Sequence, residues 1–121
     1  MIEIYYSGTS STDDPIIDLE PLDQLNSCSF NTCKSAKKIH NFKYTGSLGS
    51  MFAYSSNLIE VTGTVLNCSS LSSTFYGCIK LNNLNLAFKR TKEDGGLEEG
   101  SNATAFTYTF YSCGEITKEQ V

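Results

Sequence analysis

The sequence predicts an α/β-type solenoid: one domain of about four stacked rungs with short parallel strands and a right-handed coil. Three observations predict it. The chain has 121 residues, enough for one domain with its own core. Charged residues make up only 18%, and Ser, Thr and Asn are abundant, which disfavours a charged helical bundle. Five positions also recur together at a regular interval, as expected of a repeat protein.

The repeat is anchored on four phenylalanines with spacings of 22, 23 and 35 residues: Phe30, Phe52, Phe75 and Phe110. A small residue follows each phenylalanine by three positions, in the order Cys33, Ser55, Cys78 and Cys113. An apolar residue follows three positions later, in the order Ala36, Leu58, Leu81 and Ile116. Because one unit of about 23 residues cannot bury its apolar face alone, the units should stack and equivalent residues should form ladders. We therefore expect the four phenylalanine rings to be buried in line.

The last spacing exceeds the one before it by 35 − 23 = 12 residues. Residues 89–100 form a 12-residue segment with seven charges and three glycines, unlike any other part of the chain. The simplest explanation is an insertion between the third and fourth units.

Residues 1–24 precede the repeats as an N-terminal cap, or alternatively as an arm that reaches a partner, with an edge strand near residues 2–6. Residues 25–121 form the solenoid. Each phenylalanine-containing segment suits a single helical or 3₁₀ turn, because its apolar residues are spaced i and i+4. The strands are expected after the small residues, near 36–41, 58–62, 81–86 and 115–120.

The units Leu48–Leu58 and Leu71–Leu81 read LGSMFAYSSNL and LSSTFYGCIKL. Both resemble BspA-like leucine-rich repeats, which are built around a Leu-x-x-(Met/Ala/Thr)-Phe-x-x-Cys-x-x-Leu core. The resemblance covers residues 25–119, about four-fifths of the chain. It implies a leucine-rich-repeat-like solenoid and a role in surface adhesion rather than catalysis.

No residue pattern indicates an enzyme, a cofactor or a metal site. His40 is the sole histidine, and the repeat places it at an outward strand position, where a surface role is expected. The cysteines lie at 28, 33, 68, 78 and 113, without the paired spacing of zinc ligands, so we expect five reduced thiols. Residues 93–100 are acidic and glycine-rich but lack the ligand order of an EF-hand. No glycine-rich phosphate loop is present.

The net charge of −4 and the absence of a basic stripe disfavour nucleic-acid binding. No run of about 18 apolar residues predicts a membrane span, and the first residues lack the features of a signal peptide. We therefore expect a location in a virion or in the cytoplasm.

Three functions remain open. The first is a non-enzymatic structural or accessory subunit that binds other proteins in a larger assembly, with a phage or virus particle as the preferred setting. The second is a BspA-like surface adhesin or host-binding module, and the third is a cytosolic protein-interaction module. The partner is expected to contact the terminal rung, the N-terminal arm and the 89–100 insertion, with the outward strand face secondary, and the terminal rung is a possible site of homo-oligomer formation. The candidate contact residues are Lys38, His40, Glu60, Thr62, Asn83, Asn85, Ile116, Lys118, Gln120 and Val121.

Overall fold

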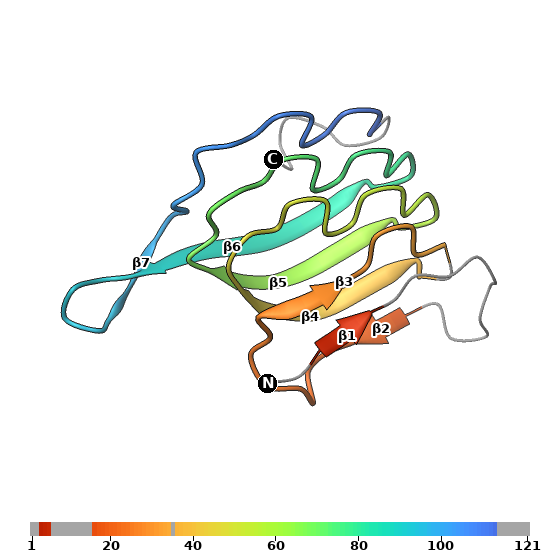
Figure 1. Ribbon diagram of the computed structural model, residues 1–121. Helices are drawn as coiled ribbons and strands as arrows, with labels where there is room; N and C mark the ends of the chain where they lie inside the picture. Colours follow the sequence, from red (N-terminus) through yellow and green to blue (C-terminus); the bar gives the residue numbers. More distant parts are fainter. Residues whose placement is uncertain (1–2, 6–15, 35, 114–121) are drawn as a thin grey trace.

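The protein is a β-solenoid of about three turns, with parallel strands on one side and irregular turn segments on the other (Figure 1). The computed structural model describes residues 3–5, 16–34 and 36–113. The strands are β1 (Glu3–Tyr5), β2 (Ile16–Asp18), β3 (Ser27–Ser29), β4 (Lys38–Thr45), β5 (Glu60–Leu66), β6 (Asn83–Thr91) and β7 (Leu97–Glu99).

The main sheet has the strand order β2-β4-β5-β6-β7, and all its neighbours are parallel except β6 and β7. Lys38 pairs with Glu60, which pairs with Asn83, so each residue lies beside its equivalent in the next repeat unit. On the inner side of this register lie Ile39 and Val61, which are fully buried, followed by the half-buried Leu84. The alternation of inward apolar and outward polar residues is what a half-buried strand requires.

The turn segments are also joined by a regular backbone ladder, although they are not strands. In the second unit, alternate N–H groups from Leu48 to Tyr54 donate to carbonyl oxygens of the third unit, at 2.6–3.0 Å. The third unit repeats the pattern against the fourth: Leu48 donates to Ser70, and its counterpart Leu71 donates to Ala105. Ser70 directly precedes Leu71, the counterpart of Leu48, and Ala105 directly precedes Phe106, the counterpart of Leu71. The pattern is therefore the same in both pairs of units, although residues 89–100 lie between Leu71 and Ala105 in the sequence. The turn segments of the second, third and fourth units therefore stack in the register that the repeat predicts.

The predictions of a helical turn in each unit and of an α/β class are wrong, because the described residues contain no helix. Each turn segment is instead a series of tight turns. In the second unit, for example, Met51 N–H donates to Leu48 O and Ala53 N–H donates to Ser50 O. Ser50 and Tyr54 have φ angles of 55° and 62°, in the left-handed region. A left-handed residue every few positions interrupts the right-handed path that a helix needs.

The strands also begin two residues later than expected and extend further, to Thr45, Leu66 and Thr91. The fourth strand, expected near 115–120, lies outside the described residues, and the described solenoid has about three turns rather than four complete rungs. The N-terminal strands continue the solenoid: Glu3 pairs with Ser27, and Ile16 pairs with Lys38. Both pairings are parallel, so β1 and β2 stack on the first repeat unit.

The core is a column of stacked phenylalanines between the sheet and the turn segments. Consecutive ring centroids along Phe30, Phe52, Phe75 and Phe110 lie 5.7, 5.3 and 5.5 Å apart, with interplanar angles of 12°, 3° and 8°. The first three rings are at most 1% exposed, whereas Phe110 is half-buried. The predicted stacking in line is confirmed, although burial of the last ring is only partial.

The predicted column of small residues carries a repeated hydrogen bond. Ser55 Oγ donates to Phe30 O at 2.6 Å, and the thiols of Cys78 and Cys113 donate to Phe52 O and Phe75 O, both at 2.9 Å. Each side chain thus binds a carbonyl of the preceding unit, which explains why small donors recur there. All five cysteines are thiols, as expected. Burial raises the pKa of Cys28 and of Cys78 to about 12, so these thiols are poor nucleophiles.

Candidate binding surfaces

The outward strand face is formed as predicted, and much of it is occupied by contacts within the chain. Glu60 lies at its centre: His40 donates to its carboxylate through Nε2, and Asn83 Nδ2 donates to Oε1 at 2.6 Å. The neighbours Lys38, Thr62 and Asn85 lie on the same face of β4, β5 and β6. The remaining candidates lie outside the described residues, namely Ile116, Lys118, Gln120 and Val121.

The contacts of Glu60 predict a pH effect on stability. The hydrogen bond from His40 is the main cause that holds the pKa of the Glu60 carboxyl below its ordinary value of 4.5. A carboxyl with a lowered folded-state pKa stabilises the fold above its unfolded pKa, and this stabilisation is lost as the pH falls through the folded pKa. We expect a loss of less than about 1 kcal/mol below pH 4.5, because the pair is partly exposed. Melting temperatures of wild type and Glu60→Gln between pH 7 and pH 3 should converge at the acid end; parallel curves would contradict the prediction.

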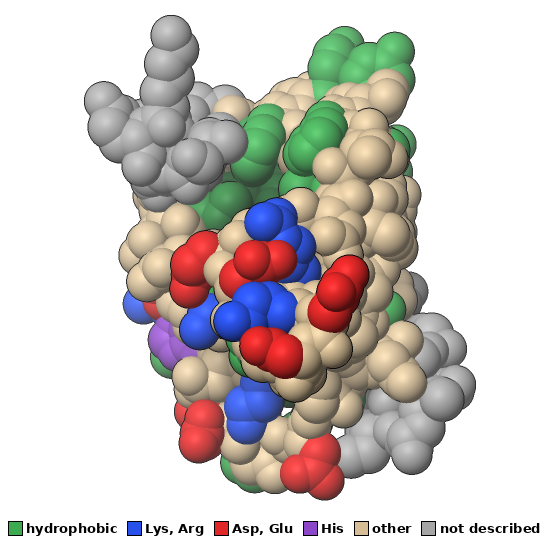
Figure 2. Space-filling model, turned by 90° about the vertical axis from the view of Figure 1, so that its left-hand side faces the viewer, with side chains coloured by type: hydrophobic (Ala, Val, Ile, Leu, Met, Phe, Trp, Pro, Cys, Tyr) green, Lys and Arg blue, Asp and Glu red, His purple; other side chains and the backbone are tan. Residues whose placement is uncertain are grey.

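An apolar cavity lies at the C-terminal end of the described solenoid. Its volume is about 560 Å³, and it is lined by Leu71, Phe75, Leu84, Leu86, Phe88, Phe106, Thr109 and Phe110. The lining residues come from the third and fourth turn segments and from the inner side of β6. Phe106 is 57% exposed, whereas its counterpart Leu48 in the second unit is fully buried. Figure 2 shows hydrophobic side chains gathered on this side of the molecule, above a group of charged ones.

The insertion borders this cavity as a β-hairpin. β6 continues into it and pairs antiparallel with β7, so that Lys89 lies opposite Glu99 and Arg90 opposite Glu98. Arg90 Nε donates to Glu98 at 2.9 Å, and Lys89 lies 3.8 Å from Glu99. Gly100 N–H donates to Phe88 O at 2.8 Å, which closes the base of the hairpin next to a cavity-lining residue. The two signs of charge therefore largely neutralise each other beside the cavity.

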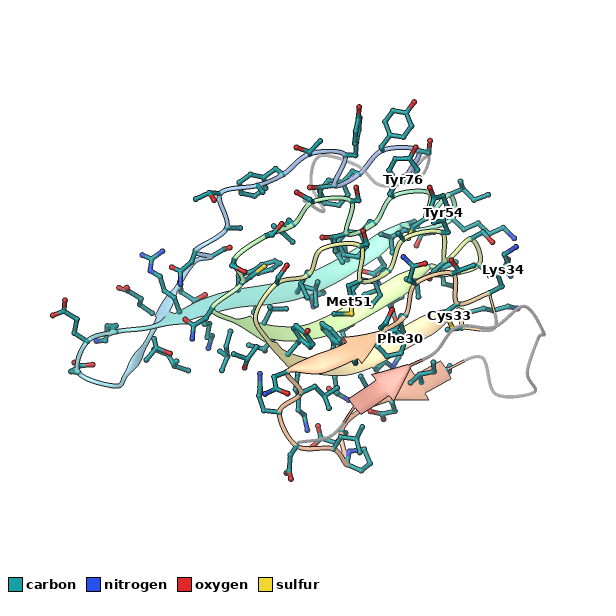
Figure 3. All side chains as sticks on the ribbon, in the orientation of Figure 1. Phe30, Cys33, Lys34, Met51, Tyr54 and Tyr76 are labelled. Atoms are coloured by element: carbon teal, nitrogen blue, oxygen red, sulfur yellow. The ribbon has the colours of Figure 1, made fainter. Side chains whose placement is uncertain are left out.

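Four exposed or half-exposed tyrosines form a second surface, at the end of the turn segments opposite the hairpin. Tyr54 and Tyr76 lie there on successive units (Figure 3). The Tyr76 ring centroid lies 5.3 Å from that of Tyr54, 6.0 Å from Tyr108 and 5.1 Å from Tyr111. Tyr54, Tyr108 and Tyr111 are each more than half exposed. We call this group, Tyr54, Tyr76, Tyr108 and Tyr111, the tyrosine patch.

Sequence reasoning missed the tyrosine patch, because only two of its residues share a repeat position. Tyr76 and Tyr111 both directly follow the phenylalanine of their unit, whereas Tyr54 follows by two positions and Tyr108 precedes by two. The left-handed φ angles of Tyr54 and Tyr108, 62° and 56°, help to bring the four rings together. Such a conformation is uncommon for a bulky residue and is often found at functional sites.

The described residues hold no group of three or more His, Cys, Asp and Glu side chains that could bind a metal ion. Nor do they include a helix long and apolar enough to cross a membrane. Comparison of the chain with protein-family models, with curated proteins and with solved structures finds no match.

Proposed function

We propose that the chain is a non-enzymatic, protein-binding subunit of a larger assembly, and that its partner continues the solenoid beyond the fourth turn segment. The observation that carries the proposal is a row of backbone donors beside the apolar cavity that have no acceptor among the described residues. In the third unit, the N–H groups of Leu71, Ser73, Phe75 and Gly77 each donate to the fourth unit. Their counterparts in the fourth unit are Phe106, Tyr108, Phe110 and Ser112, and no acceptor for these N–H groups lies among the described residues.

The ladder dictates what kind of ligand can satisfy these donors. They recur at every second residue, so the matching acceptors must recur at the same interval, as the carbonyl groups of a polypeptide do. The same ligand must place apolar groups in the cavity lined by Phe106, Phe110 and Phe88. A protein segment that adds to the end of the stack meets both requirements. The charged hairpin would then form part of the polar rim that surrounds an apolar interface centre.

Phage or virus particles are the setting that we propose for this assembly. A pull-down from the native source, read by mass spectrometry, would identify the partner and its assembly.

The first binding prediction concerns Phe106. Phe106→Asp should weaken capture of the partner at least about tenfold, because it places a charge at the mouth of an apolar contact. The matched control is Ile79→Asp: Ile79 is 51% exposed, close to the 57% of Phe106, and does not line the cavity. It should leave capture unchanged. Normal capture by Phe106→Asp, together with loss of capture in the double variant Lys38→Glu and Glu60→Lys, would instead assign the partner to the strand face.

The second binding prediction concerns the hairpin. Deletion of 89–100 should leave the fold intact, because the residues that it joins, Phe88 and Ser101, already lie close together: Gly100, the neighbour of Ser101, is hydrogen-bonded to Phe88 O at the base of the hairpin. The fourth unit also stacks on the third through its own backbone bonds. We expect an unchanged circular dichroism spectrum and weaker partner capture. Unchanged capture would remove the hairpin from the interface.

A further inference from the structure

Three kinds of contact join the turn segments of neighbouring repeat units, and each kind recurs at every junction from the first unit to the fourth. The first is the backbone ladder, in which alternate N–H groups donate to carbonyl oxygens of the following unit. The second is the stack of phenylalanine rings, with centroids 5.3–5.7 Å apart. The third runs the other way: the side chains of Ser55, Cys78 and Cys113 donate to the phenylalanine carbonyl of the unit before. A turn segment is therefore recognised by its side chains as well as by its backbone.

Two of these junctions carry a further side-chain bond. Thr74 Oγ1 donates to Leu48 O at 2.9 Å, and Thr109 Oγ1 donates to Leu71 O at 2.7 Å. Both threonines directly precede the phenylalanine of their unit, and both are buried. Since each hydroxyl meets an acceptor, its burial costs little. The pattern Thr-Phe-x-x-Cys, which the third and fourth units share, thus supplies the two side-chain bonds that a unit makes to the unit before it.

The fourth turn segment presents the receiving side of such a junction at the end of the stack (Figure 1). Phe110 O accepts the N–H of Cys113 and no second bond among the described residues. By contrast, Phe75 O accepts both the N–H of Cys78 and the thiol of Cys113. The Phe110 ring stacks on Phe75 and on no second ring in the described part of the chain. The N–H groups that have no acceptor there, called the end donors below, are those of Phe106, Tyr108, Phe110 and Ser112.

We propose that the partner docks on this end through a segment that follows the chain's own repeat: a threonine or serine, then a phenylalanine, then a cysteine or serine three positions further on. The inference rests on the protein-binding function proposed above and specifies the sequence of the segment that binds. The carbonyl groups of this segment accept from the end donors, and its ring stacks on Phe110. Its cysteine or serine donates to Phe110 O, as Cys113 donates to Phe75 O.

The docking segment is also uncharged. Residues 47–56, 70–79 and 105–113, which form the second, third and fourth turn segments, contain no Asp, Glu, Lys, Arg or His. A charge at the level of the stacked rings would lose its water without gaining an opposite charge. An acidic or a basic peptide is therefore excluded as the occupant.

A second copy of this chain does not offer a segment of this kind with an open side. The third unit is bonded to the units on both of its sides, and the fourth unit already uses its side-chain donors on the third. The first unit also has the pattern, at residues 29–33, but β1 pairs with β3 on the side that would have to dock. The partner is therefore a different chain.

The test is titration of the full chain with a neutral peptide that has the sequence of residues 69–79, under reducing conditions and followed by NMR. The amide signals of the end donors should shift, and those of Lys38 and Thr62 on the strand face should not. Phe106→Asp in the chain should abolish these shifts, and the control Ile79→Asp should retain them. Thermal melting checks that both variants are folded.

Changes in the peptide test the sequence rule itself. Phe75→Asp in the peptide should abolish binding, because it replaces the stacking ring with a charge. Thr74→Val together with Cys78→Val keeps the peptide apolar and similar in size but removes both side-chain donors, and should weaken binding about tenfold. A scrambled peptide of the same composition should not bind.

Two results would overturn the inference: no shift of the end-donor amides at millimolar peptide, or equal binding of the scrambled peptide. Self-association of the chain that Phe106→Asp abolishes would assign this end to a second copy instead. Failure of the sequence rule is distinguishable from failure of the proposed function. If Phe106→Asp loses the captured partner but no peptide binds, only the sequence rule is wrong; if the peptide binds but Phe106→Asp captures the partner normally, only the proposed function is wrong.

Discussion

Phe75→Ala should lower the free energy of unfolding by about 3–5 kcal/mol, the range for large-to-small changes in a well-packed core. The Phe75 ring is 1% exposed and stacks on Phe52 on one side and on Phe110 on the other. Its removal therefore takes away two ring contacts and opens a cavity that joins the one already present at the end of the solenoid. Urea denaturation, followed by circular dichroism, measures the change.

The matched variant is Phe110→Ala. Phe110 is half-buried and belongs to the same column, but it stacks on only one ring among the described residues. Because Phe110 buries less apolar surface than Phe75, its removal should lower the free energy of unfolding by roughly half as much or less. Equal costs at the two positions would mean that Phe110 is covered as completely as Phe75.

Gly63→Ala should cost at least about 2–3 kcal/mol, because the added methyl group overlaps backbone rather than a movable side chain. A Cβ atom at Gly63 would lie 2.6 Å from Phe42 N and 2.7 Å from Phe42 Cβ, and the φ of Gly63 is +152°. The close approach follows from a bulge in β4, between Ile39 and Phe42, where Asn41 has a φ of 59°. Phe42 pairs with Gly63 across the two strands and is fully buried, so its backbone has no room to move away from an added methyl group.

Gly95→Ala separates the steric effect from the backbone effect. Gly95 also has a positive φ, +89°, but an added Cβ would meet no atom within 4 Å. Its substitution should therefore cost only about 1 kcal/mol, from backbone strain alone. Thermal and urea denaturation of both variants test the difference; if Gly63→Ala is no more costly than Gly95→Ala, then β4 and β5 can separate without loss of packing.

The sequence alone was enough to predict the long-range order of this chain. The spacing of Phe30, Phe52, Phe75 and Phe110 predicted the stacked column, and the additional segment before Phe110 predicted the insertion. Such features can be read directly because each unit meets only its neighbours, so a position that repeats in sequence repeats in space. The outward strand residues Lys38, His40, Glu60, Thr62, Asn83 and Asn85 were placed on one face for the same reason.

What only the tertiary structure decided is how each unit is folded and which side chains meet across the columns. The i and i+4 spacing of Leu71 and Phe75 is compatible with a helical turn, yet backbone bonds to the next unit hold that segment in consecutive tight turns. Local propensity cannot reveal these bonds, because their partners lie in the next repeat unit, far along the chain. The tyrosine patch was not predicted from the sequence for a related reason. Tyr54 and Tyr108 occupy different repeat positions, and their rings reach Tyr76 only because the units stack and the backbone of both residues is left-handed.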